Sequence, residues 1–215
     1  MSFRDDVVEL KNAYFGTEYQ FIEVSRVISV DNASETFSPR LYSILGDACS
    51  QVENLLRLLC GKLEIPIADN EKNFPSYYSK LNETGILERQ FVDLLISNHA
   101  YKPFSIPQNR DSPLWWTAYN KTKHDLPAGY KQGNLGNTIQ ALAAAYSLHC
   151  ISAYVLDYGR NVLKNDWWNE LDGTSLNTQS EFPTVAERPT NTFLPKSKIF
   201  FCLSYFQDLS LGAHI

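Results

Sequence analysis

The chain has 215 residues, 44% of them hydrophobic, and a formal net charge of −5. A chain of this length and composition can bury a sizeable core, so we expect one folded domain, with or without an appendage, and not a disordered protein. The acidic balance argues against a protein that coats nucleic acid or an anionic membrane through its overall charge. Any anion binding must therefore be local.

The cysteines and the start of the chain indicate a compartment. Four widely spaced cysteines form no C-x-x-C pair: Cys49, Cys60, Cys150 and Cys202. This spacing favours free thiols in a reduced interior over a zinc site or a disulfide framework. The first residues carry acids and lack the apolar core of a signal peptide. The sequence also has no uninterrupted run of about 18 apolar residues, so no membrane span is predicted. We therefore expect a cytoplasmic protein with no membrane partner.

Two long helices are predicted in the first third of the chain. Residues 4–29 mix charged and apolar groups in a way that favours a helix, although the β-branched and aromatic residues of 19–30 leave a strand open. Ser38, followed by a proline, is a typical helix start. Apolar residues then recur at three-and-four spacing as far as Leu59, and Gly61 is placed to end this helix.

Shorter elements follow. Residues 75–82 and 87–96 predict two short helices separated by Gly85, and residues 97–112 predict a long loop with two prolines. Loops of this length are often functional. This one leads into a further helix, for which Ser112 is a suitable N-cap and the proline after it suits the first turn.

The last predicted helix, from residue 134 to about 160, is apolar on nearly every side, which is typical of a central or interface helix. From residue 166 onward the chain is rich in prolines and polar residues, with one strand candidate at 198–206 that can pair with a strand elsewhere. We therefore predict a helical domain, residues 1–163, and an appendage, residues 164–215, that contains one or two short strands.

The helix that follows the long loop concentrates chemically active side chains. At 3.6 residues per turn, Trp116, Asn120 and His124 follow one another on one face. Lys121 and Lys123 flank His124, so a titratable imidazole lies between two cations. The surrounding segment is locally basic within an acidic protein.

This helix and the one upstream of it resemble a known family. The motif reads Trp115-Trp116-Thr-Ala-Tyr119-Asn120-Lys121-Thr122-Lys123-His124, and the stretch 37–54 contains Phe-Ser-Pro and Cys-Ser-Gln-Val-Glu-Asn. Both are similar to the HEPN superfamily, the all-α proteins of RNA processing, toxin–antitoxin pairs and antiphage defence. The similarity is greatest to a bacterial branch with a W-x-x-x-Y-N-x-x-K-H signature, and it covers about residues 10–160.

The resemblance implies a mainly α, antiparallel HEPN-like bundle that forms a homodimer. In active members it implies a metal-independent endoribonuclease that needs no cofactor. Their motif is an arginine, usually a polar residue, and then a histidine. Here His124 matches the histidine and Asn120 the polar residue, but Tyr119 stands in the arginine position. His124 would act as general acid or base at the ribose 2′-OH, Asn120 would orient it or the phosphate, and Lys121 and Lys123 would bind phosphate.

The missing arginine leaves two functions open. Cleavage needs a cation to stabilise the charge of the transition state, and Lys121, Lys123, Arg110 or a partner chain would have to supply it. The first function is binding or cleavage of RNA in a toxin–antitoxin or defence setting, with an antitoxin or another protein as partner. The alternative is a catalytically inactive dimerisation or protein-interaction module. Glu53 is a weaker candidate for a polar group facing the site, because Arg57 is spaced to form a surface ion pair with it.

The same side chains also have structural interpretations. Trp115, Trp116 and Tyr119 can stack on the bases of single-stranded RNA, but aromatic residues at helical spacing more often belong to the core, which is the interpretation we favour. His124 at the end of a helix is also favoured by the helix dipole alone. The histidines are spaced too widely for a sequence-local metal site, so we expect no metal.

Overall fold

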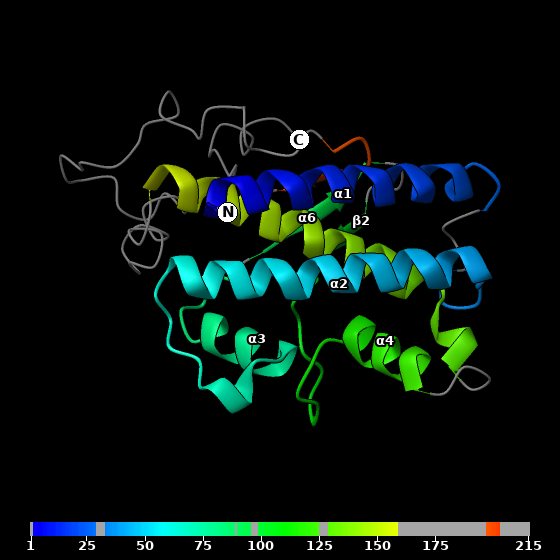
Figure 1. Ribbon diagram of the computed structural model, residues 1–215. Coiled ribbons are helices and arrows are strands. Elements are labelled where there is room, and N and C mark those ends of the chain that lie inside the picture. Colours follow the sequence, from blue (N-terminus) through cyan, green and yellow to red (C-terminus); the bar gives the residue numbers. More distant parts are fainter. Residues whose placement is uncertain are drawn as a thin grey trace, which may run out of the picture.

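The computed structural model describes residues 2–28, 33–88, 90–95, 99–124, 129–158 and 197–202. Within these ranges the protein is mainly helical, as predicted, and it also contains one small antiparallel sheet (Figure 1). The elements are α1 (Phe3–Ser25), α2 (Pro39–Lys62), α3 (Phe74–Asn82), β1 (Val92–Leu94), β2 (His99–Tyr101), α4 (Leu114–His124), α6 (Leu135–Tyr158) and β3 (Phe200–Cys202). Most of the predicted appendage lies outside the described ranges, so the boundary at residue 163 stays a prediction.

Helices α1 and α2 run antiparallel and lie side by side (Figure 1). The segment 19–30, for which a strand was open, is therefore helical as far as Ser25, and residues 29–30 lie outside the described ranges. Helix α1 starts with a capping box, in which the Asp5 N–H donates to Ser2 Oγ over 3.3 Å and the Ser2 N–H donates to the Asp5 carboxylate over 3.1 Å. Helix α2 begins at the predicted cap, where the Leu41 N–H donates to Ser38 Oγ over 3.1 Å.

The end of α2 differs from the prediction that Gly61 stops it. The helix continues to Lys62, and Glu64 adopts the left-handed backbone conformation, with a φ of 56°. The Ile65 N–H then donates to the Cys60 carbonyl over 2.9 Å and the Glu64 N–H to the Gly61 carbonyl over 3.2 Å. These two bonds satisfy carbonyls of the last turn in the pattern of a Schellman motif, here without a glycine at the left-handed position.

Helix α6 occupies the centre of the helical body, where it packs on α1, α2 and α4. Asn134 caps it by accepting a hydrogen bond from the Asn137 N–H over 2.9 Å. Its 135–156 window is long and apolar enough to cross a membrane, yet 89% of that window is buried inside the protein. The all-round apolar pattern therefore marks a central helix of the described part of the chain.

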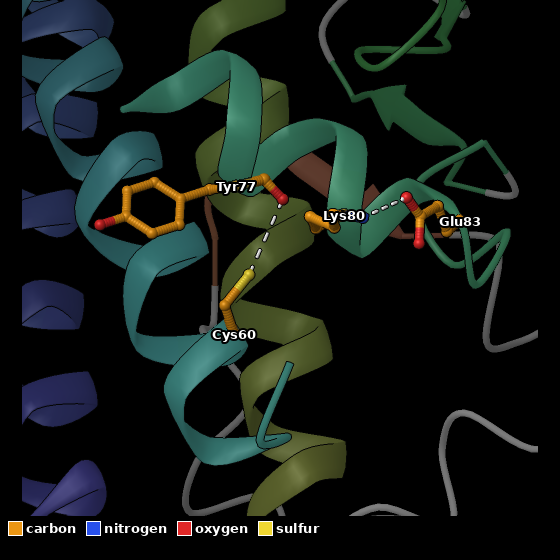
Figure 2. Close-up of polar contacts among 4 residues, drawn as sticks. All are labelled: Cys60, Tyr77, Lys80 and Glu83. Atoms are coloured by element: carbon orange, nitrogen blue, oxygen red, sulfur yellow. Dashed lines mark hydrogen bonds and ion pairs between the residues drawn. The ribbon is translucent and has the colours of Figure 1, made fainter. Parts of the chain in front are cut away.

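Helices α3 and α4 lie on the side of α2 opposite α1 (Figure 1). Figure 2 shows one contact that holds α3: the Cys60 thiol of α2 donates to the Tyr77 carbonyl over 3.7 Å. Burial raises the pKa of this thiol to about 11, so it stays protonated and serves as a donor. The Lys80–Glu83 ion pair, at 2.9 Å, is on the exposed side of α3 and contributes little to stability.

The small sheet corrects the prediction of a helix over 87–96 and of a continuous loop over 97–112. Strand β1 lies between β2 and β3, antiparallel to both. Gly85, with a φ of 73°, turns the chain before β1. The predicted strand at 198–206 is confirmed over Phe200–Cys202, whereas residues 198–199 form a bend and residues 203–206 lie outside the described ranges. A short apolar run fits a helix or a buried strand equally well, and the long-range partner β3 decides between them.

A buried carboxylate attaches β3 to the helices. Glu18 of α1 is 3% exposed and accepts hydrogen bonds from the Ser197 hydroxyl, from the Lys198 N–H over 3.2 Å and from the Tyr14 hydroxyl over 3.0 Å. Phe200 then stacks on Tyr146 of α6, with ring centroids 5.9 Å apart. These contacts tie the segment 197–202 to the helical body.

Candidate functional site

The motif helix, α4, begins one residue later than predicted. The Pro113 carbonyl accepts the N–H groups of Trp116 and Thr117, each over 3.1 Å, so Pro113 and not Ser112 closes the first turn. The Ser112 hydroxyl instead lies 3.2 Å from the Thr117 hydroxyl. The Ser112 hydroxyl thus contacts a side chain of the first turn, where a bond to a backbone N–H was expected.

Both tryptophans of the motif belong to the core. Trp115 is fully buried, and its Nε1–H donates to the Pro103 carbonyl over 2.6 Å. Trp116 is 5% exposed and stacks on Phe74 of α3, with ring centroids 3.7 Å apart and planes inclined by 15°. Neither ring is free to stack on a nucleobase. Their role is to hold α4 in a defined orientation against α3 and the preceding loop.

The remaining motif residues line up along α4. Tyr119 is half-buried, with its ring centroid 5.2 Å from that of Trp116, and the Lys123 Nζ lies 5.9 Å from the Tyr119 centroid. Asn120 is half-buried. His124 is the last residue of α4, and its side chain lies outside the described part of the structure. The expected contact between Asn120 and His124 therefore stays a prediction.

The last turn of α4 is held from two directions. The Tyr42 hydroxyl of α2 donates to the Thr122 carbonyl over 3.3 Å. Gly129 lies directly against the same turn, because a Cβ at this position would be 2.6 Å from Thr122 Cα and 2.7 Å from the Lys121 carbonyl oxygen. The start of α2, the end of α4 and the 3₁₀ turn η3 (Tyr130–Gln132) therefore meet at one end of the molecule, at the right in Figure 1.

Four exposed basic side chains come from these three elements: Arg40, Lys121, Lys123 and Lys131. We call the surface that carries these four side chains the basic end. The described residues that form this surface, 33–42, 119–124 and 129–137, contain one acidic residue, Glu35. Sequence reasoning named Lys121 and Lys123 but missed Arg40, which lies in the same first turn of α2 as Tyr42, the residue that contacts Thr122. The sequence itself indicated only that Arg40 lies in the first turn of a helix capped by Ser38.

Two predicted site residues are not part of the basic end. Arg110 is exposed in the loop before α4, and this helix of 11 residues, about 16 Å long, separates it from Lys121 and Lys123. Glu53 lies about 20 Å along α2 from its first residue. Its carboxylate accepts the Phe74 N–H over 3.1 Å and so supports the start of α3.

The predicted ion pair between Glu53 and Arg57 is wrong. Arg57 donates instead to the Asn54 side-chain oxygen over 3.2 Å. The Glu53 carboxylate, which was expected to face Arg57, instead accepts a hydrogen bond from the first N–H of α3. The N–H groups at a helix start have no acceptor within their own helix, so they bind such a carboxylate.

No family model matches the chain, and no curated protein and no solved structure matches it either. Within the described residues, no three His, Cys, Asp or Glu side chains are grouped to hold a metal ion. What the site can do is therefore argued from its own geometry and charge.

Proposed function

We propose that this protein is a HEPN-like RNA-binding protein that works in a toxin–antitoxin or antiphage defence setting and holds RNA at the basic end. One observation carries the proposal: three segments distant in sequence meet at the last turn of the motif helix, and together they carry four exposed cations in a chain of net charge −5. A local cluster of cations in an acidic protein favours a polyanionic ligand held at one place.

The anchoring of α4 supports the same proposal. Trp115 and Trp116 fix the helix in the core, so Lys121 and Lys123 project from a rigid support. A rigid support lowers the entropic cost of holding a ligand. The N-terminus of α2, next to Arg40, adds the positive end of a helix dipole to this surface.

Cleavage, in this proposal, uses His124 as the general acid or base at the ribose 2′-OH. The arginine position is filled by Tyr119, which packs against Trp116 and carries no charge. Lys123 is the cation beside that position, with its Nζ 5.9 Å from the Tyr119 ring centroid. Lys123 would therefore neutralise the developing phosphorane charge, as a single point charge and not as a two-pronged guanidinium.

RNA binding is tested with charge-matched variants. We expect Lys121→Glu/Lys123→Glu to weaken binding of a 12-residue single-stranded RNA at least tenfold, measured by fluorescence anisotropy. The control, Lys72→Glu/Lys80→Glu, changes the net charge equally on the exposed ion pairs beside and on α3. Equal loss in both variants, or no binding by the unchanged protein, would contradict the proposal.

Cleavage is tested separately, by incubating the protein with total RNA in the presence of EDTA beside a His124→Ala variant. Fragments produced by the unchanged protein alone are the expected result for a metal-independent enzyme. Identical fragments with both proteins, or none with either, would exclude catalysis by His124.

The inactive interaction module is the second candidate, and a specific observation favours it. The half-buried Tyr119 packs on the core where an active member has an arginine, so the motif lacks its usual cation. In this case the protein would form a homodimer without cutting RNA. Light scattering of the purified chain, combined with the two assays above, separates a silent dimer from a nuclease.

A further inference from the structure

Two aromatic side chains lie within the basic end. Phe37, directly before the Ser38 cap of α2, is 41% exposed, and Tyr130 opens η3 and is half-buried. Their ring centroids are 5.7 Å apart and their planes are inclined by 86°. Neither ring belongs to the hydrophobic core. In such an edge-to-face pair the edge of one ring lies against a face of the other. The remaining ring faces can therefore stack on a flat ligand.

The pair is held by the backbone on both sides. Phe37 forms an isolated antiparallel bridge with Asn134. The Leu135 N–H donates to the Thr36 carbonyl over 2.8 Å, and the Gly136 N–H donates to the Ala33 carbonyl over 2.9 Å. The segment 33–37 is thereby fastened to the start of α6. An aromatic ring on a fixed backbone loses little freedom when a ligand stacks on it.

Two basic residues lie close to this pair in sequence. Arg40 lies in the first turn of α2, one helical turn after Phe37, and Lys131 follows Tyr130 directly. Gly133, just after η3, lies against α2, because a Cβ there would be 2.9 Å from Tyr42 Cα. Exposed aromatic surface with cations around it matches a single nucleic-acid strand, whose bases offer flat faces and whose phosphates flank them.

Building on the function proposed above, we propose that Phe37 and Tyr130 form a stacking platform for one base of a single-stranded RNA. Arg40 and Lys131 contact the neighbouring phosphates, and Lys121 and Lys123 extend the path of the backbone toward the motif. A base inside a duplex is already stacked on its neighbours, so the platform selects unpaired RNA. Every base has a flat face, so the selection does not depend on sequence.

The test compares Phe37→Leu, which keeps the apolar volume without a ring, with Phe37→Trp, which keeps the ring. The probes are a 12-residue single-stranded RNA, the same strand in a duplex, and a 12-residue abasic strand with the same phosphates. We expect Phe37→Leu to weaken binding of the single-stranded RNA about tenfold and to leave the duplex and the abasic strand unchanged. Phe37→Trp should restore the affinity. Tyr19→Leu, at the exposed aromatic residue of α1, is the matched control.

The outcomes separate the platform from the RNA-binding function on which it rests. The platform is wrong if Phe37→Leu has no effect while Lys121→Glu/Lys123→Glu still weakens binding, in which case RNA binding stands. It is also wrong if Phe37→Leu weakens the abasic strand equally, which would indicate a structural change. Failure of the unchanged protein to bind any strand overturns both proposals. Tighter binding of an acidic peptide than of RNA, lost in Phe37→Leu, would assign the surface to a protein partner.

Discussion

His149 is a core residue with an unusual environment. It is fully buried on α6, and neither ring nitrogen has a hydrogen-bond partner among the described residues. Its ring meets the Tyr14 ring edge-on at 5.5 Å. Burial, with a smaller contribution from the charge of Lys11, lowers the pKa of His149 to about 3. The imidazole is therefore neutral in the folded protein at any pH above that value.

This shifted pKa predicts a dependence of stability on pH. In the unfolded chain a histidine titrates near 6.5. Below that pH the unfolded state therefore binds a proton that the folded state does not bind. The free energy of unfolding should fall as pH drops from about 6.5 to 3, by about 1.4 kcal/mol per pH unit from this residue. Above pH 7 its contribution is constant.

The variant His149→Leu should remove that part of the dependence. We expect the difference in unfolding free energy between the variant and the unchanged protein to shift in favour of the variant by about 1.4 kcal/mol for each pH unit between 6 and 4. Urea titrations at pH 8, 6, 5 and 4 measure it, and the difference cancels the contributions of the carboxylates. A difference that is constant with pH would show that His149 accepts a proton in the folded state.

At the scale of elements, the contact between Gly129 and the last turn of α4 builds the candidate site. Gly129 is not in the left-handed region, since its φ is −77° and its ψ is −21°. It is required because of space: Thr122 and Lys121 backbone atoms occupy the place of a side chain. The site therefore depends on a close approach of two backbones, which no helix propensity predicts.

A pair of glycine substitutions tests this contact. Gly129→Ala should lower the free energy of unfolding by about 1–3 kcal/mol, because α4 and η3 must move apart. It should also weaken RNA binding, since Lys121 moves with the last turn of α4. Gly16→Ala, in the middle of α1 with nothing within 4 Å, should raise the free energy of unfolding by about 0.5–1 kcal/mol. Thermal melts and anisotropy titrations measure both, and equal stability of the two variants would contradict the close approach.

At the scale of the whole molecule, RNA binding at the basic end of a protein with a net charge of −5 should depend strongly on salt. Four phosphate contacts on a single strand give a slope of about −3 for the logarithm of affinity against the logarithm of salt concentration. Lys121→Ala/Lys123→Ala should reduce this slope to about half. Titrations between 50 and 300 mM KCl provide the measurement. A slope near zero in the unchanged protein would show that the basic end does not hold the phosphates of the RNA.

Much of the helical architecture was predictable because its signals are local. The Ser38 cap and the three-and-four apolar spacing of α2 act within a few residues, and so does the all-round apolar pattern of α6. Helix starts and the buried stripe were therefore correct to within a residue or two. Even so, Glu64, and not Gly61, took the left-handed position at the end of α2, because the last-turn hydrogen bonds and not the residue preference alone set that end.

The sequence by itself determined the class of the fold, the central helix and the motif with its two lysines. Only the tertiary structure decided that β1 is a strand, that Arg110 lies apart and that Arg40 lies at the same end of the molecule as Lys121, Lys123 and Lys131. The physical reason is the range of the interactions. Helices are stabilised by bonds between near neighbours, whereas a strand needs a partner and a charged surface needs several segments, and both come from distant parts of the chain.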